Sequence, residues 1–410
     1  MNQTTRARRT TLHLLFAGSG AAALIYQVLW VRAFAGVFGV TAEAAAAVLS
    51  AFFLGLAIGS DVFGRIADRS SRPLRLYAGL ELGIALAALP IPAALALYRS
   101  VYDELFGVLS GTPILFTVFK MALTGLALLP ATILMGGTLP ALGRAVVGDA
   151  GQLGRQGGRL YAANIVGAVG GALLASFALP LWLGTWGSYA LAVFLSLSIA
   201  GVAAGLARDE PIRAPAAPAP VVGDPLAPRW RRLLALAFAS GFATIALELL
   251  WTRMLALVLH NSVYSFGSVV AVFLAGLAAG AALVARLLRR FPAWRLLRIS
   301  LLATAVLVAV TPGLLTALSG GLQTFTGYGS WLFHSLSTVA LTAAIVFAPA
   351  AAAGMALPCV WELWRARPGS GSRLGRPTAV NTVGGILGPV VAGFILLPIV
   401  GIAGGVFALA

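Results

Sequence analysis

The chain of 410 residues has few of the side chains from which soluble enzymes build their sites. Its single cysteine, Cys359, excludes an intrachain disulfide and a zinc site of the multi-cysteine kind. Only 10% of its residues are charged, against about a quarter in a typical soluble domain. So few charges cannot cover a chain of which 60% is apolar, and its mean hydropathy is +0.96. We therefore predict an integral membrane protein.

Sequence motifs for catalysis are absent as well. The sequence has no HExxH, no P-loop, no nucleophile elbow and no strand–glycine-loop–helix unit outside its apolar stretches. Gly167, Gly170 and Gly171 superficially suggest a nucleotide loop, but they lie within an apolar stretch. We expect no catalytic residue, no metal site and no cofactor in this chain, and the sequence leaves open whether it serves an enzyme.

Apolar stretches recur along the whole chain, each close to the roughly 20 residues that cross a bilayer core. They are continuously apolar rather than alternating, so they predict helices and not a barrel. The expected helices are 11–37, 42–64, 74–98, 113–145, 159–182, 184–207, 231–258, 263–287, 294–318, 331–364, 377–398 and 400 to the end. The fourth and tenth are long, and we expect Pro130, Pro140, Pro349 and Pro358 to kink or break them.

Arginines gather in every second connection between these helices, three to five in each, whereas Arg99 stands almost alone in the others. Basic connections face the cytoplasm. This pattern predicts a multi-pass protein of a bacterial inner membrane with a cytoplasmic N-terminus and a cytoplasmic central linker. The net charge of +16 then belongs to these connections, and the expected partner is the lipid bilayer and not a nucleic acid.

An internal repeat relates the two halves of the chain at an offset of about 221 residues. Matching pairs are Ser19 and Ser240, Gly20 and Gly241, Trp30 and Trp251, Gly55 and Gly276, Gly136 and Gly354, and Asn164 and Asn381. The order of the pairs is the same in both halves, so we predict two tandem six-helix repeats. They span residues 1–207 and 231–410, and a Pro/Ala-rich cytoplasmic linker, 208–230, joins them.

Both repeats begin on the same side of the membrane, which is the arrangement of the major facilitator class. Residues 64–69, Gly-Arg-Ile-Ala-Asp-Arg, also resemble a cytoplasmic loop of that class. We predict an all-α polytopic membrane protein, major-facilitator-like, with about 11–12 transmembrane helices. By the repeat, the last helix should run to about residue 424, so we expect this sequence to be truncated within it.

Four segments resemble one family. They are Gly20–Arg32, Gly241–Arg253, Leu134–Pro140 and Arg159–Gly171. Together they look like the transmembrane region of the fused major-facilitator/spermidine synthase proteins, over nearly the whole chain. The sequence departs from this family at Gln27, where Glu is common, but Glu248 keeps the acid in the second half. The resemblance implies a soluble aminopropyltransferase-like domain, and since this chain contains none, no catalytic residue is carried over.

Polar side chains within spans are costly and mark candidate sites. The candidates for substrate binding are Glu248, Glu81, Lys120, Gln27, Asn164, Asn381 and His334. Glu81 and Lys120 have the charges to form a pair, and both asparagines are also typical of hydrogen bonds between helices. Arg32 and Arg253 either line a cavity or extend to the membrane surface, with Trp30 and Trp251 as interfacial residues. Asp61, Arg65, Asp68 and Arg69 indicate a structural charge cluster.

Three functions remain open at this point. The first is a membrane module that binds or transports a small molecule such as a polyamine cation, with Glu248 and Glu81 as its contacts. The second is a membrane-bound aminopropyltransferase-like enzyme whose catalytic domain is missing here. The third is a non-transporting scaffold that docks a soluble domain or protein partner at its cytoplasmic face.

Overall fold

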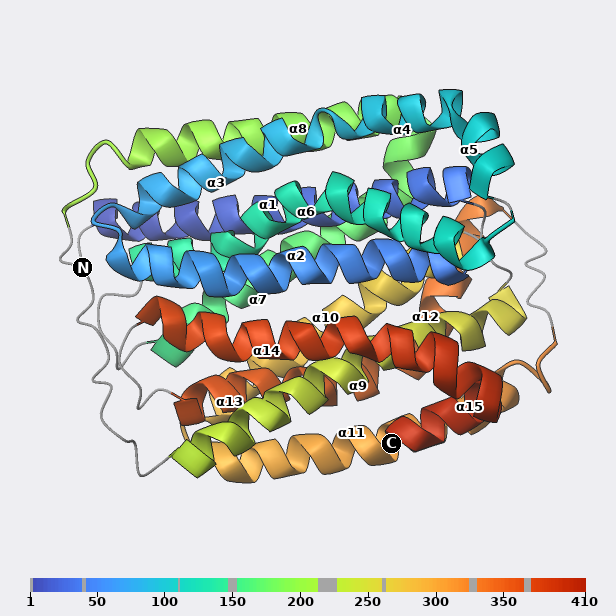
Figure 1. The fold of residues 1–410 in the computed structure, drawn as a ribbon. Coiled ribbons are helices and arrows are strands. Elements are labelled where there is room, and N and C mark those ends of the chain that lie inside the picture. The colour runs from blue at the N-terminus through green and yellow to red at the C-terminus, as the bar shows by residue number, and fades with distance from the viewer. Residues whose placement is uncertain are drawn as a thin grey trace.

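A computed structural model describes residues 3–38, 42–109, 111–146, 153–212, 227–259, 263–323, 330–364 and 370–410. All regular structure in these ranges is helical, and the helices lie side by side in one elongated bundle (Figure 1). The first half contains α1 (Gln3–Phe38), α2 (Ala42–Arg69), α3 (Pro73–Ala88), α4 (Ile91–Ser100), α5 (Tyr102–Leu109), α6 (Pro113–Val146), α7 (Leu153–Leu173), the π-helical turn η2 (Leu174–Ala178) and α8 (Leu179–Leu206).

The second half repeats this order in α9 (Ala227–Leu259), α10 (Val263–Leu287), α11 (Ala293–Leu318), α12 (Trp331–Gly354), α13 (Ala356–Trp364), α14 (Ser370–Val391), the π-helical turn η3 (Ala392–Leu396) and α15 (Leu397–Leu409). The chain reverses at each end of the bundle (Figure 1). Helices α2, α6, α8, α10 and α13 all finish at the end where the N-terminus lies, which we call the basic end because Arg69, Arg144, Arg208 and Arg286 lie there. Residues 213–226 of the expected linker fall outside the described ranges.

Ten helical stretches are long and apolar enough to cross a membrane, and one of them, Arg159–Leu206, has 48 residues. As a straight helix it would be roughly 72 Å long, more than twice the bilayer core. It reverses at Gly184, whose φ of 66° is left-handed and favours glycine. Gly401 has a φ of 68° at the matching place in α15. The expected boundaries near 183 and 399 are therefore real turns between spans.

The prolines act differently in the two long helices. Helix α6 continues through Pro130 and Pro140, so these prolines do not break it. The tenth span does break, between α12 and α13 at Met355, close to Pro349 and Pro358. An unexpected break separates α3 from α4 at Pro90, where a helix hydrogen bond lacks its donor.

The repeat is visible in hydrogen bonds and backbone geometry. Asn164 donates through Nδ2 to the carbonyl oxygen of Phe16 at 3.0 Å, and Asn381 donates to that of Ala237 at 2.9 Å. These are matching residues in the two halves, since 16 and 237 differ by 221. The turns η2 and η3 also occupy corresponding places, after α7 and α14.

The two halves meet along two related surfaces. Helix α2 packs against α14, and α7 packs against α10. The repeat converts one pair into the other, because α2 corresponds to α10 and α7 to α14. Ala172, Val270 and Ala271 are buried together in the second interface. The halves are thus related by an axis along the bundle, as in a parallel repeat.

Two tryptophans are placed differently from the expectation. Trp30 and Trp251 are not interfacial residues: each is only 1% exposed, within the core of its own half. Trp30 donates through Nε1 to the hydroxyl of Tyr189, and Trp251 to the hydroxyl of Thr311, both at 3.3 Å. A buried indole N–H needs such an acceptor, and these contacts are possible only because the helices supplying them pack alongside.

A buried carboxylate ties the end of α8 to the start of α3. Glu210 accepts hydrogen bonds from the backbone N–H of Leu74 at 2.9 Å and of Arg75 at 3.2 Å. The first N–H groups of a helix have no partner within it, and a negative charge there is favourable. The contact joins segments 135 residues apart at the basic end of the first half.

Candidate functional site

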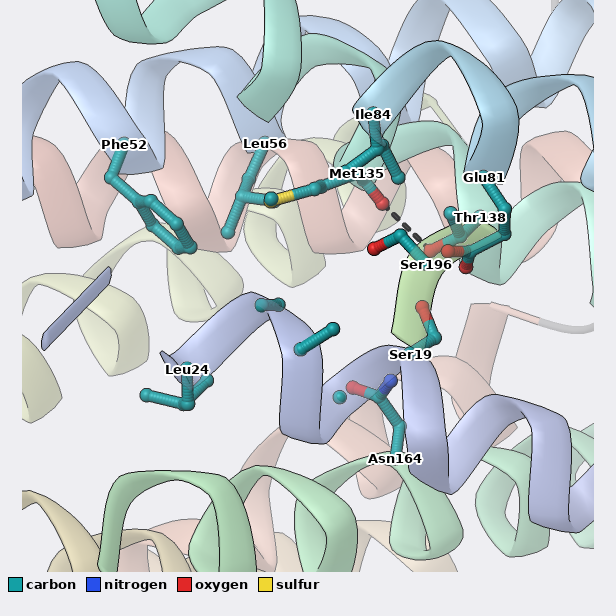
Figure 2. Close-up of a pocket in the computed structure, with 13 residues that line it drawn as sticks. Ser19, Leu24, Phe52, Leu56, Glu81, Ile84, Met135, Thr138, Asn164 and Ser196 are labelled. Carbon is teal, nitrogen blue, oxygen red and sulfur yellow. Dashed lines mark hydrogen bonds between the residues drawn. The ribbon is translucent and has the colours of Figure 1, made fainter. Parts of the chain in front are cut away.

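A polar cavity of about 120 Å³ lies among the helices of the first half (Figure 2). Five of its helices contribute polar side chains: α1, α3, α6, α7 and α8. The polar lining consists of Ser19, Glu81, Thr138, Asn164 and Ser196, and Leu24, Phe52, Leu56, Ile84 and Met135 close the rest. Polar and apolar walls in one enclosed space are typical of small-molecule sites.

Glu81 supplies the charge of this cavity. It lies in the middle of α3 and is 1% exposed. The hydroxyl groups of Ser19 and Tyr77 face its carboxyl group, yet Oε1 makes no hydrogen bond to any described residue. The Ser196 hydroxyl is also buried, beside the hydroxyl of Tyr26. A buried carboxyl oxygen without a hydrogen bond is costly, and a bound polar molecule would satisfy it.

The cavity depends on close contact between α1 and α7. A side chain at Gly20 would overlap the backbone carbonyl of Asn164, so only glycine allows this approach. The Asn164 amide then reaches the backbone of α1 while its residue lines the cavity. Small residues let helix backbones approach in this manner within membranes.

The second half has a smaller counterpart of about 40 Å³. Its lining includes Ser240, Thr244, Leu277 and Asn381, which match Ser19, Ala23, Leu56 and Asn164. No acidic residue lines it. The repeat therefore supplies two related cavities, and only the first contains a carboxylate.

The other two candidates near the middle of the bundle occupy matching places. Gln27 in α1 and Glu248 in α9 are 5% and 7% exposed. Neither lines the polar cavity of the first half or its smaller counterpart in the second. Their role as substrate contacts stays a prediction.

Lys120 and His334 lie near the opposite end of the bundle from the basic end, at the starts of α6 and α12. The Lys120 ammonium group lies 4.2 Å from the centre of the Phe116 ring. Glu81 is eight residues from the basic end of α3 and Lys120 is 26 residues from that of α6. At 1.5 Å per residue they differ in depth by roughly 27 Å, which is too far for the two side chains to form the pair that their charges allow.

The four charged residues of the predicted cluster lie on the second half of α2. Asp61 and Arg65 form an ion pair one helical turn apart, and the Arg65 Nε also donates to the Asp61 carbonyl oxygen at 3.3 Å. Asp68 and Arg69 follow at the last turn of α2. The pair is exposed on the surface of the bundle.

Hydroxyl residues were missed as candidates. Ser19, Thr138 and Ser196 line the cavity, but serine and threonine are common in spans and often bond to their own helix. Thr138 does so, donating to the Met135 carbonyl oxygen at 2.7 Å. The one available signal was the repetition of Ser19 at Ser240.

No family model and no curated protein sequence matches the chain. Solved structures do. The E. coli fucose:proton symporter aligns with a TM-score of 0.64 at 16% identity, covering 98% of this chain and 95% of that one. A bacterial homologue of the iron transporter ferroportin aligns with a TM-score of 0.59 at 15% sequence identity, covering 98% of this chain and 96% of that one. The human organic anion transporter MFSD10 aligns with a TM-score of 0.58 at 16% sequence identity, covering 98% of this chain and 96% of that one. The chain thus has the fold of the major facilitator transporters, an all-helical multi-pass bundle of two tandem six-helix repeats.

Proposed function

We propose that this chain is a transporter-like membrane module that binds a small organic cation in its first-half cavity. The observation that carries the proposal is the carboxyl group of Glu81, which lines the cavity and whose buried Oε1 makes no hydrogen bond to any residue the structure describes. Burying an ionisable group within a membrane span has a high free-energy cost, and such groups commonly bind a ligand or line a substrate pathway. The basic end faces the cytoplasm in this proposal, as its arginines favour.

The size of the cavity limits the ligand. A cavity of about 150 Å³ holds a benzene molecule, which has about six non-hydrogen atoms. The 120 Å³ here therefore suits a cation of similar size, such as putrescine, or one end of a longer polyamine. An ammonium group would donate to Glu81, and its hydrocarbon chain would contact Leu56 and Met135.

Polyamines are the proposed class because of the resemblance to the fused spermidine synthase proteins. The structural neighbours carry chemically different solutes by their names, a sugar, organic anions and iron, so the fold leaves the substrate open. If a soluble aminopropyltransferase-like domain acts with this module, the cavity would deliver or remove its substrate. A scaffold without transport would have no need of a buried carboxylate in a cavity.

The test is the thermal stability of the detergent-purified protein with putrescine and with spermidine. A ligand that binds the folded state raises its stability, by about 2.7 kcal/mol at a hundred times Kd. We expect a saturable rise that Glu81→Gln abolishes and that Glu248→Gln, a buried acid outside the cavity, retains. No rise with either amine would refute the polyamine cavity. A rise that only Glu248→Gln abolishes would place the site in the second half.

Flux separates the remaining functions. Purified protein in liposomes should accumulate radiolabelled putrescine, and Glu81→Gln should not. Binding without flux would instead favour the alternative in which the module presents substrate to an enzyme domain.

A further inference from the structure

A groove of about 480 Å³ opens on the side of the bundle where α2 of the first half meets α14 of the second. One helical stripe of each helix lines it. The α2 stripe is Leu54, Ala57, Ile58, Asp61 and Arg65, and the α14 stripe is Arg376, Ala379, Val380 and Val383. Its volume lies in the usual range of ligand pockets.

The apolar part of the groove faces the lipid tails. Leu54, Ile58 and Val383 are 39%, 39% and 42% exposed although they lie in membrane-spanning helices. Side chains exposed at this depth contact hydrocarbon. A groove between them is therefore filled by acyl chains and not by water.

The polar part of the groove is basic and lies toward the basic end. Arg65 is paired with Asp61, whereas Arg376 has no hydrogen bond or ion pair to any described residue. The charges of Asp61, Arg65 and Arg376 sum to +1. Two guanidinium groups at the end of an apolar groove match a phosphodiester attached to acyl chains, because arginine binds phosphate oxygens through paired N–H groups.

We propose that this groove binds one anionic glycerophospholipid. Arg376 and Arg65 hold its phosphate, and one acyl chain runs along Leu54, Ile58 and Val383. Basic pockets between spans on the cytoplasmic side bind anionic headgroups for the same reason. Since the two arginines belong to different halves, the bound lipid bridges the halves and favours the arrangement in which α2 and α14 are together.

The repeat supplies a matched control. Arg286 and Arg159 correspond to Arg65 and Arg376 at the α10–α7 interface, but Ala282 replaces Asp61 there. That interface is packed by Ala172, Val270 and Ala271, and neither of its two arginines lines the α2–α14 groove or the two cavities described above. Only the α2–α14 side should take the lipid.

The experiment compares phosphatidylglycerol with phosphatidylcholine of the same acyl chains, added to protein purified in a neutral detergent, by native mass spectrometry and thermal stability. We expect one phosphatidylglycerol to bind in preference and to raise the unfolding midpoint. Arg376→Gln should weaken its apparent affinity about tenfold, as for loss of a charge-assisted hydrogen bond. Arg159→Gln should leave it unchanged.

A second variant tests the apolar part. Val380→Trp keeps both arginines and fills the groove, and it should reduce lipid binding as Arg376→Gln does. Three results would overturn the proposal: equal binding of the two lipids, the same stabilisation by glycerol phosphate without acyl chains, or loss of the preference in Arg159→Gln and not in Arg376→Gln.

Discussion

Asn164 and Asn381 each place an amide inside the bundle and donate it to the backbone of a neighbouring helix. Their acceptors, the carbonyl oxygens of Phe16 and Ala237, already belong to helices, so the amide adds a second hydrogen bond to each. Such bonds within membranes contribute about 0.6 kcal/mol on average and up to about 1.7.

We expect Asn164→Ala and Asn381→Ala to destabilise the protein by similar amounts, about 0.5–1.7 kcal/mol each. The measurement is reversible unfolding in mixed micelles. Thr316→Ala is a suitable control, because the Thr316 hydroxyl is exposed and bonds only within its own helix. A loss confined to one asparagine would show that the two hydrogen bonds are not equivalent.

The candidate site was predictable only where a polar side chain is rare in its span. Glu81 and Asn164 could be found this way, and both line the cavity. Glu248 carries the same chemical signal yet lines none of the described cavities. The sequence shows which polar side chains carry a high free-energy cost when they are buried. Whether a cavity lies beside such a side chain depends on how the neighbouring helices pack.

At the scale of helices, glycines decide which pairs come close. A side chain at Gly167 of α7 would overlap the backbone of Ala17 in α1, whereas one at Gly170 would meet nothing within 4 Å. The close contact recurs in the second half, where a side chain at Gly384 would overlap the backbone of Phe238 in α9. Gly167 therefore permits the contact that brings Asn164 to α1, and Gly170 does not.

This difference predicts opposite effects of one substitution within a single helix. Gly167→Ala should force α1 and α7 apart and cost about 1–3 kcal/mol. Gly170→Ala should be neutral or stabilise by up to about 1 kcal/mol, because alanine favours helix. Unfolding midpoints of the two variants in one detergent compare them directly. Equal loss in both variants would contradict the proposed close contact.

Most helices were predictable from apolar length, because a span must be long and uncharged. The expected 263–287 matches α10 at both ends. The short α5 and the break between α3 and α4 were not predicted. Eight residues of α5 are too few to span, and a proline within an apolar stretch predicts a break no better than continuity, as α6 demonstrates.

For the whole molecule, side chains of the two halves contact one another at the basic end. Leu374 of α14 is 1% exposed and lies 3.3–3.4 Å from where a side chain at Gly143 or Gly157 would begin. The rings of Tyr161 and Trp361 meet edge to face, with centroids 5.4 Å apart. Both contacts cross from the first half to the second, so the basic end is held together.

A pair of cysteines tests this closure. In a Cys359→Ala background, Gly157→Cys with Leu374→Cys should form a disulfide on mild oxidation. The Leu374 Cγ lies 4.0 Å from where a Cβ at Gly157 would begin, and the Leu374 Cβ is one bond from that Cγ, which brings the two Cβ atoms near the separation of about 3.5–4.5 Å in disulfides. The single variants are the controls, and mobility on a non-reducing gel is the measurement. If the chain transports a cation as proposed, that cation should slow the reaction by favouring separation of the halves at this end. No disulfide under any condition would mean that the halves do not meet here.

The sequence by itself determined the membrane environment, the helical class, the order of the spans and the tandem repeat. These follow from composition, from apolar length and from residues that recur at a constant offset. The tertiary structure alone decided the burial of Trp30 and Trp251, the separation of Glu81 from Lys120, and the groove between α2 and α14. Each of these depends on which helices become neighbours, and in a chain whose spans are almost all apolar, that choice is made by close packing of small residues and not by the hydrophobic pattern.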